Sequence, residues 1–165
     1  MKFNYYGFKA IYVHEMNRFL RTMAQSLLSP VISTSLYFVV FGSVIGGYIQ
    51  KIDGVSYGSY IVPGLLMLTL LTQSISNTSF GIFFPKFNGT INEILAAPIS
   101  TLETVLAFVG AGATKTLIVG AVIYFTATFF ADVNVKYPML MIFLLVLVSF
   151  TFALFGFLIG VVSKD

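Results

Sequence analysis

Four long apolar stretches, joined by short polar connections, limit what this chain can fold into. A helix needs about 20 apolar residues to cross the hydrocarbon core of a bilayer, and each stretch is long enough. The stretches cover residues 24–48, 60–84, 104–131 and 138–162. Inside lipid the backbone must satisfy its own hydrogen bonds, which a helix does. The sequence therefore predicts an all-α integral membrane protein whose residues 1–165 form a single transmembrane domain with four spans.

Composition argues against a water-soluble fold. Only 9% of the residues are charged, whereas soluble proteins carry roughly 25%, and 58% are hydrophobic. Cysteine is absent and His14 is the single histidine, so we expect no disulfide and no metal site. The sequence contains no P-loop pattern G-x-x-x-x-G-K-S/T, no H-E-x-x-H, no G-x-S-x-G and no paired carboxylates within a span. We therefore expect neither a catalytic site nor a cofactor, and no enzyme activity in this chain.

Lysine and arginine residues predict the orientation, because cytoplasmic connections of membrane proteins carry an excess of them. We attribute the net charge of +3 to this orientation rather than to nucleic-acid binding. With the N-terminus in the cytoplasm, six of these residues lie inside and two outside. The inner six are Lys2, Lys9, Arg18, Arg21, Lys86 and Lys164, and the outer two are Lys51 and Lys136. We expect a multi-pass protein of the cell (inner) membrane, with the connection 85–103 in the cytoplasm.

Residues 5–22, before the first span, have the pattern of an amphipathic helix. At 100° per residue most apolar side chains share one arc, while Glu15, Arg18, Arg21 and other polar side chains share the opposite arc. Such a helix lies in the membrane interface with its basic groups toward anionic lipid headgroups. The alternative is a plain extension of the first span. We expect Ser29-Pro30 to bend the chain into the membrane.

A short polar segment, residues 87–100, separates the second and third spans and predicts a two-turn helix over residues 90–97. Thr90 and Glu93 have the spacing of a capping box, and Pro98 ends the helix one residue earlier. A helix this short is marginal alone, so it must be held by docking. On the cytoplasmic side it serves either as a site for a soluble partner or as a plain interfacial turn.

A second capping box predicts where the third span begins. Ser100 and Glu103 have the spacing at which a hydroxyl and a carboxylate satisfy the first N–H groups of a helix. The two caps together specify a helix, a break and a new helix.

Two features place polar groups inside the spans. The second span carries Thr69, Thr72, Gln73 and Ser76 on one helical face. Polar side chains in lipid need partners, so this face meets either another helix or a transport path. Lys115 is the one charged residue deep in a span. We expect it to lie in the inner leaflet and to extend its ammonium group to the cytoplasmic headgroups.

Pairs of small residues predict where helices approach one another closely, because they allow backbones to come together in a membrane. The sequence has two G-x-x-x-G pairs, Gly42 with Gly46 and Gly156 with Gly160, and a small-residue run at Gly110–Ala113. We expect tight helix contacts at all three places.

The order of these parts resembles the type-2 ATP-binding-cassette (ABC) permease family, the membrane subunits of many exporters. Three stretches carry the resemblance. They are the amphipathic segment 5–22, the aromatic-x-x-aromatic-x-x-Pro-Gly pattern of Tyr57–Gly64, and the loop Gly89–Pro98. Each is weak alone, and their order and spacing make the resemblance specific.

The resemblance implies that residues 90–97 are a coupling helix that docks on a separate ABC ATPase subunit. The contact residues would be Thr90, Ile91, Asn92, Glu93, Ile94 and Leu95. It also implies a homodimer of six-helix subunits that moves substrate outward with ATP hydrolysed by the partner. This chain matches the N-terminal part of such a subunit, so we expect a fragment that lacks the fifth and sixth helices.

Two other functions remain consistent with the residues. A four-span scaffold or assembly protein would use the segment 90–97 as an interfacial anchor and would not transport. A secondary transporter is disfavoured because no acidic residue lies in a membrane core to carry protons or sodium. The direction of transport and the homodimer follow from the resemblance alone.

Overall fold

The computed structural model describes residues 3–46, 48, 51–52, 54–131, 133 and 135–163. Lys2 and Lys164, which entered the orientation argument, lie outside this description, as does the side chain of Lys51. Four helices are long and apolar enough to cross a membrane, which confirms the all-α membrane fold class. They are α2 (Met23–Val39), whose span continues to Gly42, α3 (Tyr57–Phe87), α5 (Thr101–Ala127) and α6 (Pro138–Val162).

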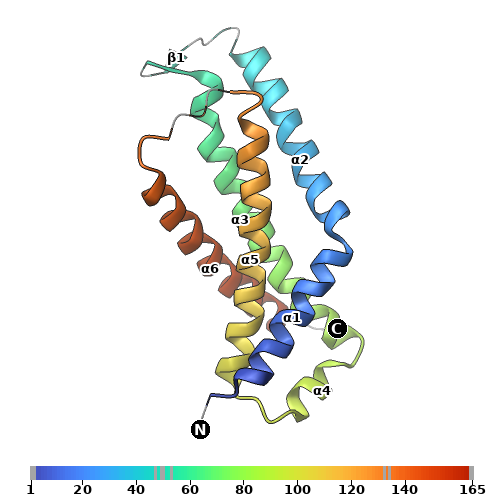
Figure 1. Ribbon diagram of the computed structural model, residues 1–165. Coiled ribbons are helices and arrows are strands. Elements are labelled where there is room, and N and C mark those ends of the chain that lie inside the picture. The colour runs from blue at the N-terminus through green and yellow to red at the C-terminus, as the bar shows by residue number, and fades with distance from the viewer. Residues whose placement is uncertain are drawn as a thin grey trace.

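The four long helices form a bundle in which consecutive helices run in opposite directions (Figure 1). A further helix, α1 (Tyr5–Arg21), precedes α2 and lies beside α5. Helix α4 (Ile91–Ala96) connects α3 to α5 at the end of the bundle where the chain begins. At the opposite end α2 continues as a π-helical segment, η1 (Val40–Ile45), followed by a small hairpin of β1 (Lys51–Ile52) and β2 (Val55–Ser56).

The chain turns between α1 and α2 at Thr22, which precedes Ser29-Pro30, the place where the sequence predicts a bend. Thr22 leaves helical geometry (φ −108°, ψ 18°), whereas Pro30 lies within α2. The Thr22 hydroxyl donates to the carbonyl of Arg18 at 3.2 Å, so the end of α1 is closed at the turn. Helices in membranes tolerate an internal proline because neighbouring groups compensate for the lost hydrogen bond.

Helix α6 meets α3 through small residues. Its four buried residues, Ser149, Ala153, Gly156 and Gly160, recur every three or four positions and therefore share one face. The Ser74 hydroxyl of α3 donates to the carbonyl of Ser149 at 2.6 Å across this contact. The structure thus confirms the close approach predicted at Gly156 and Gly160.

Of the two other close contacts predicted from small residues, one is confirmed and one is wrong. Gly112 lies directly against the Thr78 hydroxyl, so the run in α5 also marks a close contact. Gly42 has no neighbouring atom within 4 Å of the place where a Cβ would lie. The contact expected at Gly42 and Gly46 is therefore wrong, because both residues lie in or beside η1, where Gly46 meets only the backbone of Gly42.

A lysine of α3 holds the C-terminal end of α6. The Lys86 ammonium donates to the carbonyls of Val161 at 2.9 Å and Ser163 at 2.7 Å, with a longer contact to Gly160 at 3.4 Å. The last carbonyls of a helix have no partner within the helix, and a cation there also opposes the negative end of the helix dipole. Lys86 therefore fastens the end of α6 to the end of α3.

Lys86→Met is expected to lower the free energy of unfolding by about 1 kcal/mol, because the carbonyls at the end of α6 lose a cationic donor. Thermal unfolding of the purified protein in detergent measures the change. Lys136→Met removes an exposed lysine from the α5–α6 connection and serves as the control. Equal stability of the two variants would contradict the capping role of Lys86.

Candidate functional site

Helix α4 is set between two sharp changes of backbone direction. Gly89 precedes it with a positive φ of 76°, a conformation that glycine adopts without strain. The helix then runs for six residues, and Ala97 is extended (φ −71°, ψ 147°), as expected before Pro98. The chain thus leaves α3, makes a turn and a half of helix, and turns again into α5.

The first predicted capping box, between Thr90 and Glu93, does not form. Thr90 precedes α4, but its backbone is helical (φ −63°, ψ −18°) and its side chain makes no cap hydrogen bond. A capping hydroxyl reaches the following N–H groups from an extended backbone, which Thr90 lacks. Backbone carbonyls serve instead: Gly89 accepts from Asn92 at 3.2 Å and Thr90 accepts from Glu93 at 3.1 Å.

Helix α4 has an inner and an outer face. Ile94 packs against a buried cluster formed by Ile11 of α1, Ile82 of α3, and Ala107 and Phe108 of α5. Ile91 is also half-buried. These two isoleucines supply the docking that so short a helix requires.

The outer face of α4 is exposed. Helical spacing predicts that Leu95 shares one face with Ile91 and Ile94, but this prediction is wrong, because Leu95 is 75% exposed. Thr90, Asn92 and Glu93 are exposed as well. Four of the six predicted partner-contact residues are therefore free to meet another molecule, while Ile91 and Ile94 hold α4 on its own bundle.

Glu103 joins three segments of the chain. The predicted capping box with Ser100 is present: the Ser100 N–H donates to Glu103 Oε2 at 2.8 Å, and the Glu103 N–H donates to the Ser100 hydroxyl at 3.3 Å. Glu103 Oε1 also accepts from the N–H of Asn4 at 2.6 Å. The Asn4 side chain donates to the carbonyl of Pro98 at 3.1 Å and accepts from Gly7 at the start of α1. The starts of α1 and α5 and the end of the α4 connection therefore meet here.

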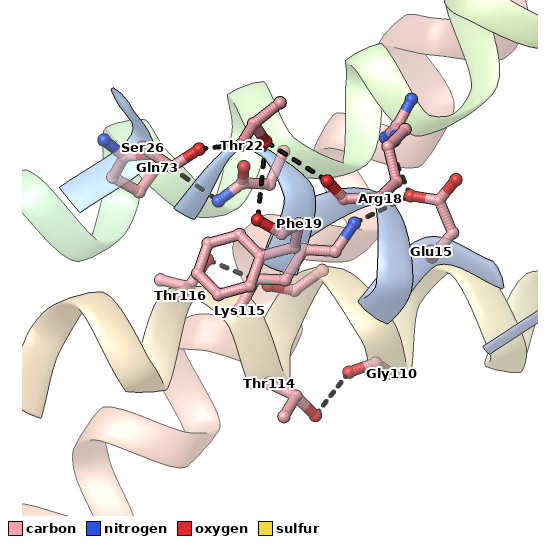
Figure 2. A network of polar contacts seen from close by, with 12 residues as sticks. Glu15, Arg18, Phe19, Thr22, Ser26, Gln73, Gly110, Thr114, Lys115 and Thr116 are labelled. Carbon is pink, nitrogen blue, oxygen red and sulfur yellow. Dashed lines mark hydrogen bonds and ion pairs between the residues drawn. The ribbon is translucent and has the colours of Figure 1, made fainter. Parts of the chain in front are cut away.

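Lys115 does not extend toward the headgroups as predicted, but pairs with Glu15 of α1. Glu15 Oε2 lies 2.7 Å from the Lys115 ammonium and 2.7 Å from the Arg18 guanidinium (Figure 2). The side chains of Lys115 and Glu15 are 3% and 4% exposed, and that of Arg18 is 32% exposed. A buried ammonium is stable only with a counter-ion, and α1 brings one to it.

Sequence reasoning missed Glu15 because it assigned this residue to the outward arc of α1. In the structure Glu15 lies between Ile11 and Phe19 on the buried face, which contacts α5. The signal was in the spacing, since positions 11, 15 and 19 follow one another at intervals of four and share a helical face. Of the predicted basic residues, Arg18 pairs with Glu15, and Arg21 is exposed.

The polar face of α3 turns away from α5 and α6. Thr72 and Ser76 are exposed, and Thr69 and Gln73 are half-buried. Thr69 and Thr72 donate to carbonyls of their own helix, at 2.8 Å to Leu65 and at 3.0 Å to Leu68. Their oxygens therefore remain available as acceptors.

An uncharged groove of about 290 Å³ separates this face from α2. Leu68, Thr69, Thr72 and Gln73 line it on the α3 side. Ser29, Pro30, Ser33, Thr34 and Tyr37 line the α2 side. Ser76 is not among the lining residues. The groove brings together seven side chains that carry a hydroxyl or an amide and none that is ionisable at neutral pH.

Comparison with known proteins finds similarity to membrane transport permeases. The family model described as ABC-2 type transporter matches residues 6–165. The inner membrane transport permease YadH of Escherichia coli strain K12 is 37% identical over 156 residues, which are 94% of this chain and 61% of YadH. YadH of Shigella flexneri matches to the same extent. The chain thus spans about 61% of the length of the curated relatives it matches. No solved structure matches it.

Proposed function

The chain belongs to the ABC-2 type transporter family of membrane permeases, and on that premise we propose that it is the permease subunit of an ABC exporter. In this proposal it moves substrate outward, and a separate ATPase subunit hydrolyses the ATP. The two-faced helix α4 is the observation that carries the proposal. An element that transmits movement between two molecules needs a face for each, and α4 has an inner face on the bundle and an exposed outer face.

In the proposed mechanism, ATP binding draws two ATPase subunits together and displaces α4. The contacts of α4 distribute that displacement, because Ile94 packs against a cluster to which three different helices contribute Ile11, Ile82 and Phe108. The helices beside the α2–α3 groove then separate or bend, and substrate moves outward. Thr69, Thr72 and Gln73 would line the path. A second copy of the chain packing against the same face is the alternative use of these residues.

The proposed orientation has the N-terminus and α4 in the cytoplasm of a cell with an inner membrane. The cations support it, because Lys9, Arg18, Arg21 and Lys86 belong to elements at the α4 end of the bundle. Among the described side chains, Lys136 alone carries a positive charge in the connections at the opposite end. The positive-inside rule therefore favours this orientation.

Leu95→Asp is expected to weaken binding of the ATPase subunit at least tenfold. A hot-spot residue at the centre of an interface costs about 2 kcal/mol or more when it is lost, and a tenfold weakening corresponds to about 1.4 kcal/mol. Because Leu95 is 75% exposed, the change should leave the fold intact. The measurement is mass spectrometry of the complex purified from native membranes in mild detergent, with quantification of any co-purified P-loop ATPase.

Leu95→Met, which keeps an apolar side chain of similar size, is the matched control and should retain the ATPase. Undiminished recovery of the ATPase with Leu95→Asp would refute the role of α4. If no ATPase accompanies the unaltered protein, the four-span scaffold becomes the better account.

A further inference from the structure

Helix α1 is fastened to α5 at two distant points. Near its start the backbone of Asn4 bonds to Glu103, and near its far end Glu15 pairs with Lys115. On an α-helix, residues 4 to 15 span about 16 Å and residues 103 to 115 about 18 Å. The two spans match, so α1 runs alongside α5 in the same direction, as Figure 1 shows.

Further contacts join α1 to α5 and to the connection that leads into it. The Tyr12 hydroxyl of α1 donates to the Thr114 hydroxyl of α5 at 2.9 Å. Gly7 of α1 lies against Ile99, in the connection just before α5, where an added Cβ would approach to 2.7 Å. Beyond Glu15, Phe19 joins a buried cluster with Val119 and Ile123 of α5. Helix α1 therefore contacts α5 over most of its length.

The attachment also reaches α4. Asn4, whose backbone bonds to Glu103, donates through its side chain to the carbonyl of Pro98, the residue at which the chain leaves α4 for α5. The point about which α4 would move is therefore held by α1 as well as by α5. Because Lys115 secures the far end of α1, the ion pair and the α4 pivot belong to one connected unit.

We propose that α1 is a strut that fixes the position of α4 relative to α5, with Glu15, Lys115 and Glu103 as positioning residues. A displacement of α4 is then passed to α1 and α5 together, and the ion pair stiffens a joint more than ten residues away. The source of that displacement rests on the proposed ATPase partner. The strut itself does not depend on it.

The variant Lys115→Met removes the ion pair and is expected to leave the bundle folded, so that the effect of the ion pair can be measured by itself. Arg18 still neutralises Glu15 in this variant, and methionine fills much of the space of the lysine stem. Holding α1 against α5 would then bury Glu15 with a single, partly exposed cation. The far end of α1 should therefore move away from α5 while the bundle stays folded. Thr126→Val, which alters an α5 hydroxyl bonded within its own helix, is the matched control.

Because the sequence contains no cysteine, single cysteines can be introduced at chosen positions and labelled with nitroxide spin labels. One pair, at Asn17 and Leu102, reports on α1 against α5, and a second pair, at Asn92 and Ala121, reports on α4 against α5. All four positions are exposed. Pulsed electron–electron double resonance on the whole chain in lipid nanodiscs, without any partner protein, gives the distance distribution of each pair.

Lys115→Met should broaden both distributions, and Thr126→Val should leave both narrow. Broadening of the α1 pair alone would overturn the strut, because α1 would then be held without positioning α4. Unchanged distributions for both pairs would also overturn it, since the ion pair would not hold α1.

A transport measurement extends the test to the complex with its ATPase. Lys115→Met should keep ATPase binding and ATP hydrolysis while substrate moved per ATP falls by roughly 2- to 30-fold, the range typical of residues along a coupling path. Undiminished transport per ATP would refute the role in coupling. Failure of the unaltered chain to bind any ATPase would instead refute the proposed function, and the spin-label result would still decide on the strut.

Discussion

Replacing Glu15 with leucine is expected to destabilise the protein by about 3–5 kcal/mol, because the change leaves Lys115 buried without a counter-ion. That is a large part of the 5–15 kcal/mol that typically holds a protein folded. Lys115 is 3% exposed, and Glu15 is its one ion-pair partner in the part of the chain that the structure describes, whereas Glu15 has two cationic neighbours. The loss should therefore be far larger for Glu15→Leu than for Lys115→Met.

The double variant Glu15→Leu/Lys115→Leu tests the cause. Replacing both members of a buried ion pair with apolar residues of similar size is often neutral. We expect the double variant to recover most of the stability that Glu15→Leu loses. Thermal unfolding in detergent and the yield of monodisperse protein measure all three variants. A double variant as unstable as Glu15→Leu would show that Glu15 acts through something other than Lys115.

Replacing Gly156 with alanine is expected to push α6 away from α3. A Cβ at this position would lie 2.5 Å from the carbonyl oxygen of Ile75 and 2.9 Å from its Cα. Both are backbone atoms, so the contact is relieved only if a whole helix shifts. Overpacking of this kind typically destabilises a protein by about 1–3 kcal/mol.

Gly64→Ala is the matched control for Gly156→Ala. Both glycines lie inside helices, so alanine brings the same gain in helix propensity at each. At Gly64 nothing lies within 4 Å of the added carbon. The difference between their unfolding temperatures therefore isolates the helix contact. Equal temperatures would mean that α3 and α6 are not in close contact at Gly156.

The sequence predicted those features that depend on neighbouring residues. The spans follow from runs of apolar residues, and the cap at Ser100 follows from a carboxylate three positions later. The close approach at Gly156 was likewise visible in the spacing of small residues, because α6 is regular around it. In each case the determining groups lie within a few turns of one helix.

Features that depend on distant groups were not predicted. The partner of Lys115 lies 100 residues away, and only the fold shows which helix brings a carboxylate to it. Thr90 has the residue type and spacing of a cap, but the turn made by Gly89 leaves its backbone in a helical conformation. Gly42 and Gly46 have the spacing of a contact motif, but neither meets a neighbouring helix.

The order of synthesis decides when the Glu15–Lys115 pair can form, because the two residues lie 100 positions apart. At about 5–20 residues per second, Lys115 leaves the ribosome roughly 5 to 20 seconds after Glu15. During that interval Glu15 has Arg18 as its partner, three residues further along the same helix. The negative charge of Glu15 is therefore balanced within α1 before α5 has been synthesised. Helix α1 can therefore reach its native place against α5 only after 100 further residues have been synthesised.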